Sequence, residues 1–174
     1  MNLEEVAEFL SESRIAVMAT INRDGTPQLT PNWYRYDGRV LTFVTTKERL
    51  KYINLRRDNR VSVCIYAAPM ASDYVVIKGT ATFNDQDMWG EARLIMARYV
   101  SEDEIDDHLE MWKTQPRVLV TVTPTRISSR SRSGSEPSRW KPRRSRLNSG
   151  FFPEGPVETR PVGELEVCPR NHKE

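Results

Sequence analysis

Residues 44–58 read VTTKERLKYINLRRD, and this stretch begins where a hydrophobic strand ends and continues as an amphipathic helix. Hydroxyl and basic side chains gather at the junction and in the first turns: Thr45, Thr46, Lys47, Arg49 and Lys51. A helix N-terminus carries unpaired N–H groups and a partial positive charge, so such side chains favour an anion there, typically a phosphate. The stretch therefore predicts a phosphate-binding site; the alternative is a basic first turn that is only solvated surface.

The start of this helix decides which cations can share one ligand. Side chains two residues apart on a helix point about 200° apart. Arg49 and Lys51 therefore diverge if the capping pattern T-x-x-E at 45–48 begins the helix at Thr46. If the helix begins nearer Leu50, Arg49 lies in the loop and both cations can converge. We expect the later start.

The hydrophobic pattern around this stretch predicts six strands, at 14–21, 26–36, 39–44, 61–67, 74–83 and 117–122. Turn sequences NRDG at 22–25 and DG at 37–38 join neighbouring strands as hairpins. Pro31 cannot donate to a ladder, so the second strand has an edge, bulge or break there, and Gly79 marks a bend or close approach. Turn-linked pairs without a GxGxxG motif favour a mainly β fold with helices, a six-stranded antiparallel closed or split barrel.

Three further helices are expected, at 3–10, 87–100 and 102–113. The first has an N-terminal capping pattern in Asn2 and Glu5, and the last has one in Ser101 and Glu104. The short first helix is expected to lie over one end of the barrel or sheet.

The charge distribution divides the chain into a barrel domain, 1–126, and an Arg/Ser/Pro-rich tail, 127–174. The first part holds sixteen Lys and Arg against eighteen Asp and Glu, and the tail holds ten against six. A general nucleic-acid-binding surface is therefore not indicated for the barrel. The tail is read as disordered because it has little apolar content. It is a solvated extension, an interaction tail that binds nucleic acid nonspecifically, or the product of a reading-frame shift.

Cysteine and apolar patterns exclude several classes of protein. No CxxC or Cys/His cluster of zinc-site type exists, so no metal site is expected, and Cys64 is read as a small buried hydrophobe. No apolar run approaches the roughly 18–20 residues of a membrane span. The acidic, amphipathic N-terminus is unlike a signal peptide, and a reducing cytoplasm is the simplest location.

Catalytic constellations are scarce in this sequence, and we assign no catalytic residue. The two histidines are His108, on an acidic helix where a surface or interface role is expected, and His172 in the tail. No GxSxG, HExxH or Walker motif occurs. If the chain is an enzyme, a cofactor is expected to supply the reactive atom.

Three segments together resemble a known family: IAVMATINRDGTPQLTPNWY at 15–34, LTFVTTKERLKYINLRRDNRVSVCI at 41–65, and YVVIKGTATF at 74–83. They resemble the pyridoxamine-phosphate-oxidase-like split β-barrels, also called FMN-binding split barrels. More narrowly, they resemble the flavin/deazaflavin oxidoreductases that use coenzyme F420. The similarity covers about residues 3–126, and its most specific parts are ATINRDGTPQLTPNWY and the basic run that ends in NLRRD.

The resemblance implies a homodimer with two cofactor sites at the subunit interface. It implies that the second strand, around Pro31, Asn32 and Trp33, runs alongside the cofactor ring. It also implies that the phosphate is held by Thr45, Thr46, Arg49 and Lys51. Asn54 is expected to pack the helix against the barrel.

The aromatic and amide residues of the second strand have a second interpretation. Trp33 and Tyr34 are also consistent with barrel packing, which we expect for Tyr34. Asn32 could hydrogen-bond the ring edge or satisfy the Pro31 bulge.

The resulting hypothesis is an oxidoreductase that transfers a hydride between F420 and a small organic acceptor. The alternatives are an FMN-dependent flavin reductase or oxidase, and a non-catalytic flavin- or haem-binding protein. Vitamin B6 oxidation is not expected, because the tail does not match the basic C-terminal substrate segment of pyridoxamine phosphate oxidase proper.

Overall fold

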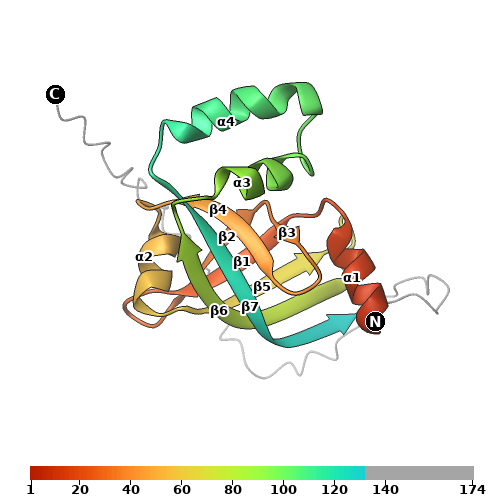
Figure 1. The fold of residues 1–174 in the computed structure, drawn as a ribbon. Helices are drawn as coiled ribbons and strands as arrows, with labels where there is room; N and C mark the ends of the chain where they lie inside the picture. The colour runs from red at the N-terminus through yellow and green to blue at the C-terminus, as the bar shows by residue number, and fades with distance from the viewer. Residues whose placement is uncertain (132–174) are drawn as a thin grey trace, which may run out of the picture. The chain divides into compact units, whose positions relative to one another are not determined.

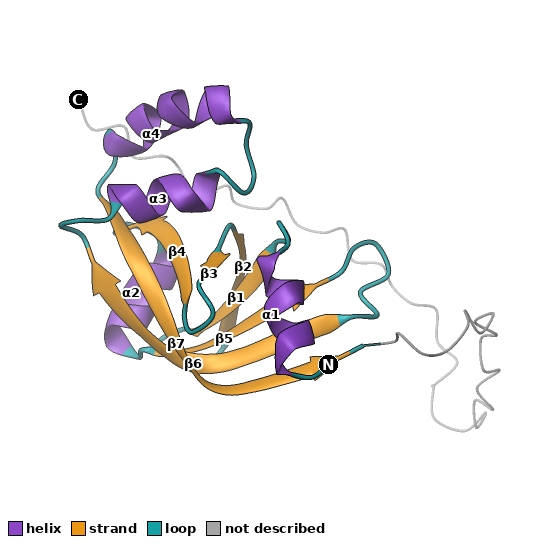
Figure 2. Cartoon of the chain, turned by 45° about the vertical axis from the view of Figure 1, so that its right-hand side comes forward, coloured by secondary structure: helices purple, strands orange, loops and turns teal. Residues whose placement is uncertain are grey.

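A computed structural model describes residues 1–131 and confirms a mainly antiparallel β architecture with helices (Figures 1 and 2). The predicted disordered tail, apart from its first residues, lies outside the described residues. The strands are β1 (Ala16–Ile21), β2 (Pro27–Asn32), β3 (Arg35–Tyr36), β4 (Leu41–Thr46), β5 (Arg60–Tyr66), β6 (Tyr74–Asn84) and β7 (Arg117–Arg130). The helices are α1 (Leu3–Ser11), α2 (Leu50–Arg57), α3 (Trp89–Met96), a 3₁₀ turn (Glu102–Glu104) and α4 (Ile105–Lys113).

The described strands form one sheet in the order β2-β1-β5-β6-β7-β4-β3. Its two edge strands, β2 and β3, follow each other in the chain with only Trp33 and Tyr34 between them. The sheet must therefore curve until its two edges meet at that connection, which gives a half-barrel with a seam at Trp33 and Tyr34. We call this place the seam.

The seam corrects the predicted strand count from six to seven. The segment at 26–36 was expected to be one strand, but it is divided between the two edges of the sheet. Pro31 does lie on an edge strand, paired with Val17 on one side only, as its missing N–H requires. The break follows two residues later.

Strand β7 is longer than its apolar core of 117–122 predicted. It continues to Arg130, which pairs with Tyr74 at the start of β6. Four residues that we assigned to the tail, 127–130, therefore belong to the sheet. They alternate between half-buried and exposed positions, and only Ile127 among them is apolar, so hydrophobicity alone does not reveal a strand here.

Gly79 permits the close approach that its position predicted. The β6–β7 register shifts between Lys78 and Gly79, and a Cβ atom on Gly79 would lie 2.3 Å from the carbonyl oxygen of Thr123. No side chain fits at this bulge without moving the backbone of β7.

Helix α1 begins at the predicted capping box. The Asn2 side chain accepts a hydrogen bond from the Glu5 N–H at 2.8 Å, and the Glu5 carboxylate accepts one from the Asn2 N–H at 3.0 Å. The expected cap at Ser101 is wrong, because its hydroxyl bonds to the Glu104 carboxylate and caps no backbone N–H. A 3₁₀ turn there precedes α4.

Two hydrophobic cores result. One fills the barrel, and the other joins α3 and α4 to Leu119 of β7. Figures 1 and 2 show α3 next to the barrel and α4 on its outer side, so this helical pair forms a cap at one end. None of the helices in residues 1–131 is long and apolar enough to cross a membrane.

Candidate functional site

The junction between β4 and α2 has the geometry that lets Arg49 and Lys51 point toward one place. Helix α2 begins at Leu50, so the later start is confirmed and Arg49 precedes the helix as its N-cap residue. Thr45 and Thr46 end β4, where they pair with Val118 and Arg117 of β7. The ladder keeps both threonines extended, so the alternative helix start at Thr46 does not occur.

A pocket of about 470 Å³ lies at this junction. It brings together all the residues that we assigned to cofactor binding, namely Pro31, Asn32, Trp33, Thr45, Thr46, Arg49 and Lys51, while Lys47 from the same basic stretch lies outside it. Six further residues complete its lining: Ile15, Val44, His108, Met111, Trp112 and Arg117. The pocket is therefore built from β2, the seam, β4, α2, α4 and the first residue of β7.

Three cations share the pocket without a carboxylate partner among the described residues: Arg49, Lys51 and Arg117. Burial, and then the charge of Arg49, lower the pKa of Lys51 to about 8. The same two causes, in the same order, lower the pKa of Arg117. Three like charges held close in a partly desolvated place are costly unless an anion joins them.

Lys51 is 7% exposed, and its ammonium donates to the side-chain oxygen of Asn32 on β2. The Asn32 amide nitrogen donates in turn to the Thr30 carbonyl oxygen at 2.7 Å. Asn32 therefore joins the edge strand to the helix, which neither of its two expected roles included.

The threonines add hydroxyl groups beside these cations. Thr45 and Thr46 are 5% and 8% exposed as residues, and both line the pocket. Their hydroxyls are not among the fully buried side-chain atoms without a partner, which in residues 1–131 are the Nε atoms of Arg14 and Arg98. A phosphate between the threonines and the three cations could accept from both groups, so these residues fit a phosphorylated cofactor.

Aromatic rings form the other wall of the pocket. Trp33 and Trp112 both line it, with ring centroids 6.3 Å apart and planes 30° apart. The Arg117 guanidinium lies 4.2 Å above the Trp112 ring. Tyr34 is fully buried and donates its hydroxyl to the Leu10 carbonyl at 3.0 Å, which confirms barrel packing for this residue.

His108 is also a residue of the pocket wall. We predicted a surface or interface role for His108, and that role stays a prediction; what the sequence reasoning did not include is that this half-buried side chain lines the pocket. The signal was its spacing on α4, where His108, Met111 and Trp112 stand at i, i+3 and i+4 and so share one face. Ile105 and Leu109, on the neighbouring face, fill the core of the cap.

Asn54 anchors the helix that carries Lys51. It is 1% exposed, and its amide donates to the Thr20 hydroxyl at 3.2 Å and to the Asn22 side-chain oxygen at 2.9 Å. These bonds tie α2 to β1 and its turn, which confirms the predicted packing role.

A larger hollow of about 860 Å³ lies at the other end of α2, beside Arg56, Arg57 and Arg60. Two of these charges already have partners. Arg57 donates to the Ile21 carbonyl, and Arg60 pairs with Asp58 at 2.6 Å. Size alone therefore does not make this hollow the better anion site.

Fold and site together define a split β-barrel protein with a pocket lined by three cations at its seam. The sequence profile of the pyridoxamine 5'-phosphate oxidase family matches residues 3–131, and the chain belongs to that family. The family match, together with the fold, supports a flavin- or deazaflavin-related oxidoreductase family.

Solved structures agree with this assignment. A conserved hypothetical protein from Mycobacterium tuberculosis is 30% identical over 75% of this chain and 85% of its own, with a TM-score of 0.63. An F420 reductase is 24% identical over 70% of this chain and 94% of its own, with a TM-score of 0.57. General stress protein 26 from Bacillus anthracis shares the fold at 15% identity over 74% and 92%, with a TM-score of 0.54.

Proposed function

We propose that this chain is an oxidoreductase that transfers a hydride between coenzyme F420 and a small organic acceptor. The observation that carries the proposal is the set of three cations without carboxylate partners, beside an aromatic wall, in one pocket. Similarity in fold to an F420 reductase supports the deazaflavin over FMN, which is the alternative cofactor.

In this proposal the residues of the pocket bind and orient. Arg49, Lys51 and Arg117 hold the cofactor phosphate by charge-assisted hydrogen bonds, which are shorter and stronger than neutral ones. Asn32 aims the Lys51 ammonium from the edge strand. The bound deazaflavin would supply the hydride chemistry.

The opposite wall controls the surroundings of the ring. Trp33 and Trp112 present flat apolar faces that exclude water from one side of it. Met111 extends this apolar wall and is 53% exposed in the single chain. The proposed substrate therefore enters over a surface that favours apolar or aromatic acceptors.

The test is a fluorescence titration of the purified full-length chain with F420 and, separately, with FMN. We expect micromolar binding of F420, weakened about 10- to 100-fold by Lys51→Ala because one charged hydrogen bond is lost. Lys47→Ala is the matched control, since Lys47 is exposed, pairs with Asp85 at 2.6 Å and lies outside the pocket. Its affinity should equal that of the wild type.

Other results would separate the alternatives. Tight FMN binding without F420 binding would show that the proposed cofactor is wrong and that the pocket binds FMN instead. An affinity that does not depend on Lys51 would refute the phosphate site.

Haem binding without turnover is the second candidate, favoured by the position of His108 in the pocket wall. A Soret band that is lost in His108→Ala would establish it.

We also propose a homodimer. Large apolar side chains stay exposed on β2 and α2, with Leu29, Leu50 and Ile53 at 63%, 50% and 51%. A second copy covering them would bury this apolar surface. Light scattering on the wild type and on Ile53→Glu tests this: a dimer for the first and a monomer for the second are expected, and a monomeric wild type refutes it.

A further inference from the structure

A column of stacked side chains runs from the pocket into the body of the protein. The Trp33 ring is nearly parallel to the Tyr99 ring, at 3° with centroids 5.1 Å apart. Trp112 continues the column at 6.3 Å from Trp33, and Arg117 caps it. Tyr99 itself does not line the pocket.

Tyr99 is held more firmly than the tryptophan that it touches. Its hydroxyl donates to the Arg14 carbonyl at 2.7 Å and accepts from the Tyr34 N–H at 3.2 Å. Trp33, in contrast, lies in the seam between two strands, where no ladder fixes its backbone. Its ring orientation therefore depends on the side chains packed against it.

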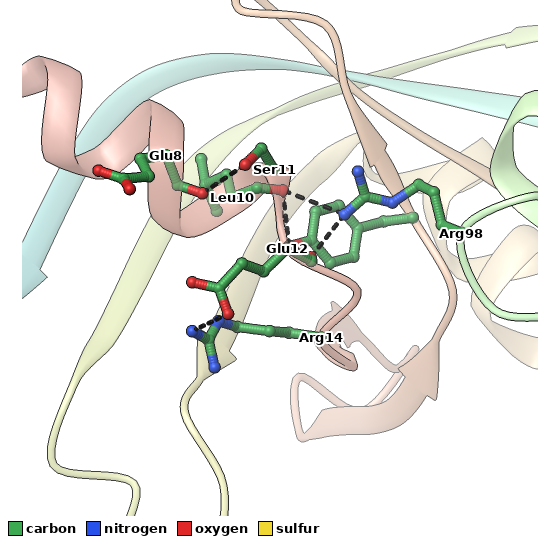
Figure 3. A network of polar contacts seen from close by, with 7 residues as sticks. Glu8, Leu10, Ser11, Glu12, Arg14 and Arg98 are labelled. Carbon is green, nitrogen blue, oxygen red and sulfur yellow. Dashed lines mark hydrogen bonds and ion pairs between the residues drawn. The ribbon is translucent and has the colours of Figure 1, made fainter.

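Arg98 secures the segment that carries Tyr99. Its guanidinium donates to the carbonyls of Leu10 and Glu12, at 3.2 Å and 2.6 Å, where α1 ends (Figure 3). A cation at the carbonyl end of a helix satisfies groups that have no partner within the helix. The same guanidinium lies 5.0 Å above the Tyr34 ring.

We infer that Tyr99 is a positioning residue for the pocket: it sets the plane of the Trp33 ring, while Arg98 and the end of α1 hold its chain segment in place. The identity of the pocket ligand in this inference rests on the proposed function. Parallel stacking favours one orientation of the less constrained partner, here Trp33, by several-fold. Trp33 thus meets a flat ligand without having to reorder.

The first test is a double-mutant cycle on cofactor affinity, with F420 and FMN as the probes. Trp33→Leu is expected to weaken binding about tenfold and Tyr99→Leu about fivefold, as a lost stacking contact does. If Tyr99 acts through Trp33, the double variant binds as Trp33→Leu does. If the double variant instead weakens binding by the product of the two single effects, the two residues act independently and the inference is overturned.

The second test needs no cofactor and so remains informative if the proposed function fails. The chain is labelled with 5-fluorotryptophan, and the Trp33 ¹⁹F resonance is identified by its loss in Trp33→Leu. We expect Tyr99→Leu to broaden or split this resonance. One sharp Trp33 resonance in Tyr99→Leu would show a fixed ring without Tyr99 and would overturn the inference.

One further variant serves as a control. Tyr52→Leu removes an aromatic that packs edge-on against Phe83 at 5.2 Å outside the pocket, and it should change neither readout. If Tyr52→Leu changes the affinity and the Trp33 resonance as much as Tyr99→Leu does, the effect comes from a general loss of packing, and the inference is overturned.

If Tyr99→Leu fails to fold, Tyr99→Phe decides the question. It keeps the ring and loses only the hydroxyl bonds, so it should weaken binding about twofold in the presence of Trp33 and have no effect in Trp33→Leu. An equal effect in both backgrounds would overturn the inference.

Discussion

At the N-terminal end of α2, Arg49 and Lys51 face a pocket without a carboxylate partner among residues 1–131. At its C-terminal end, Arg57 and Arg60 are held by the Ile21 carbonyl and the Asp58 carboxylate. The residue types match, and the second end even has the larger hollow. The comparison teaches that a candidate anion site is marked by a buried cation without a carboxylate partner, such as Lys51, more than by charge or volume; Arg57 and Arg60 at the other end are exposed.

Charge reversal at the two ends should give the largest difference. Arg49→Glu places a carboxylate among the residues proposed to bind phosphate, and we expect it to weaken cofactor binding by roughly 100-fold or more. Arg60→Glu at the other end should leave affinity within about twofold, because exposed charges are screened by solvent. Isothermal titration on both variants measures this. Equal losses would abolish the distinction between the ends.

The pH dependence of binding should further distinguish the two ends of α2. The pKa of Lys51 is lowered to about 8, so above that pH the empty pocket loses the ammonium that binds phosphate. The dissociation constant should rise up to about tenfold between pH 7 and pH 9. Lys51→Arg should remove this dependence, since a guanidinium stays charged. An unchanged pH profile in Lys51→Arg would show that another group is responsible.

The titration of Lys51 should also make folding stability depend on pH. Rising pH should weaken ligand binding but stabilise the protein without ligand. Between about pH 8 and the ordinary lysine value of 10.5, the unfolded chain binds a proton at Lys51 that the folded chain does not. Stability without ligand should therefore increase with pH across this window, relative to Lys51→Met. Urea unfolding of both proteins at pH 7.5 and pH 9.5 measures the difference; a decrease would contradict the burial of a charged Lys51.

The anchor of α2 should matter for stability and less for binding. Asn54→Ala removes two buried hydrogen bonds and should cost about 2 kcal/mol of unfolding free energy. We expect a loss of affinity of only about two- to fivefold, because the cations remain and the helix start shifts slightly. Denaturant unfolding and titration of the same samples compare the two effects. Full affinity with full stability would show that these bonds do not position α2.

The smallest effect is expected at His108. It lines the pocket without contributing to the cation cluster, so His108→Ala should weaken F420 binding no more than about twofold. A titration beside Lys51→Ala checks this order. A larger loss than that of Lys51→Ala would move the centre of the site to α4.

Much of the fold could be predicted from patterns between residues that are close in the sequence. The glycine turns, the Asn2 capping box and the strand periodicities each depend on neighbours in the sequence, and Gly25 and Gly38 do have positive φ. The same holds for the start of α2, which followed from asking which geometry lets Arg49 and Lys51 converge.

Contacts between residues that are far apart in the sequence could not be predicted. Arg117 and Trp112 join a pocket defined by residues more than sixty positions away, and nothing in the periodicity of α4 states what its second face will contact. The length of β7 was missed for the same reason, since its last residues are strand only because β6 offers them a partner.

The position of β7 has a consequence for how the protein is made. As the last described strand in the chain, it lies between β6 and β4, which share one sheet only through it. Before β7 has been synthesised and inserted, β2-β1-β5-β6 and β4-β3 are separate hydrogen-bonded sheets, with Asn32 in the first and the threonines of the pocket in the second. The proposed cofactor site is therefore completed only when β7 takes its place, late in synthesis.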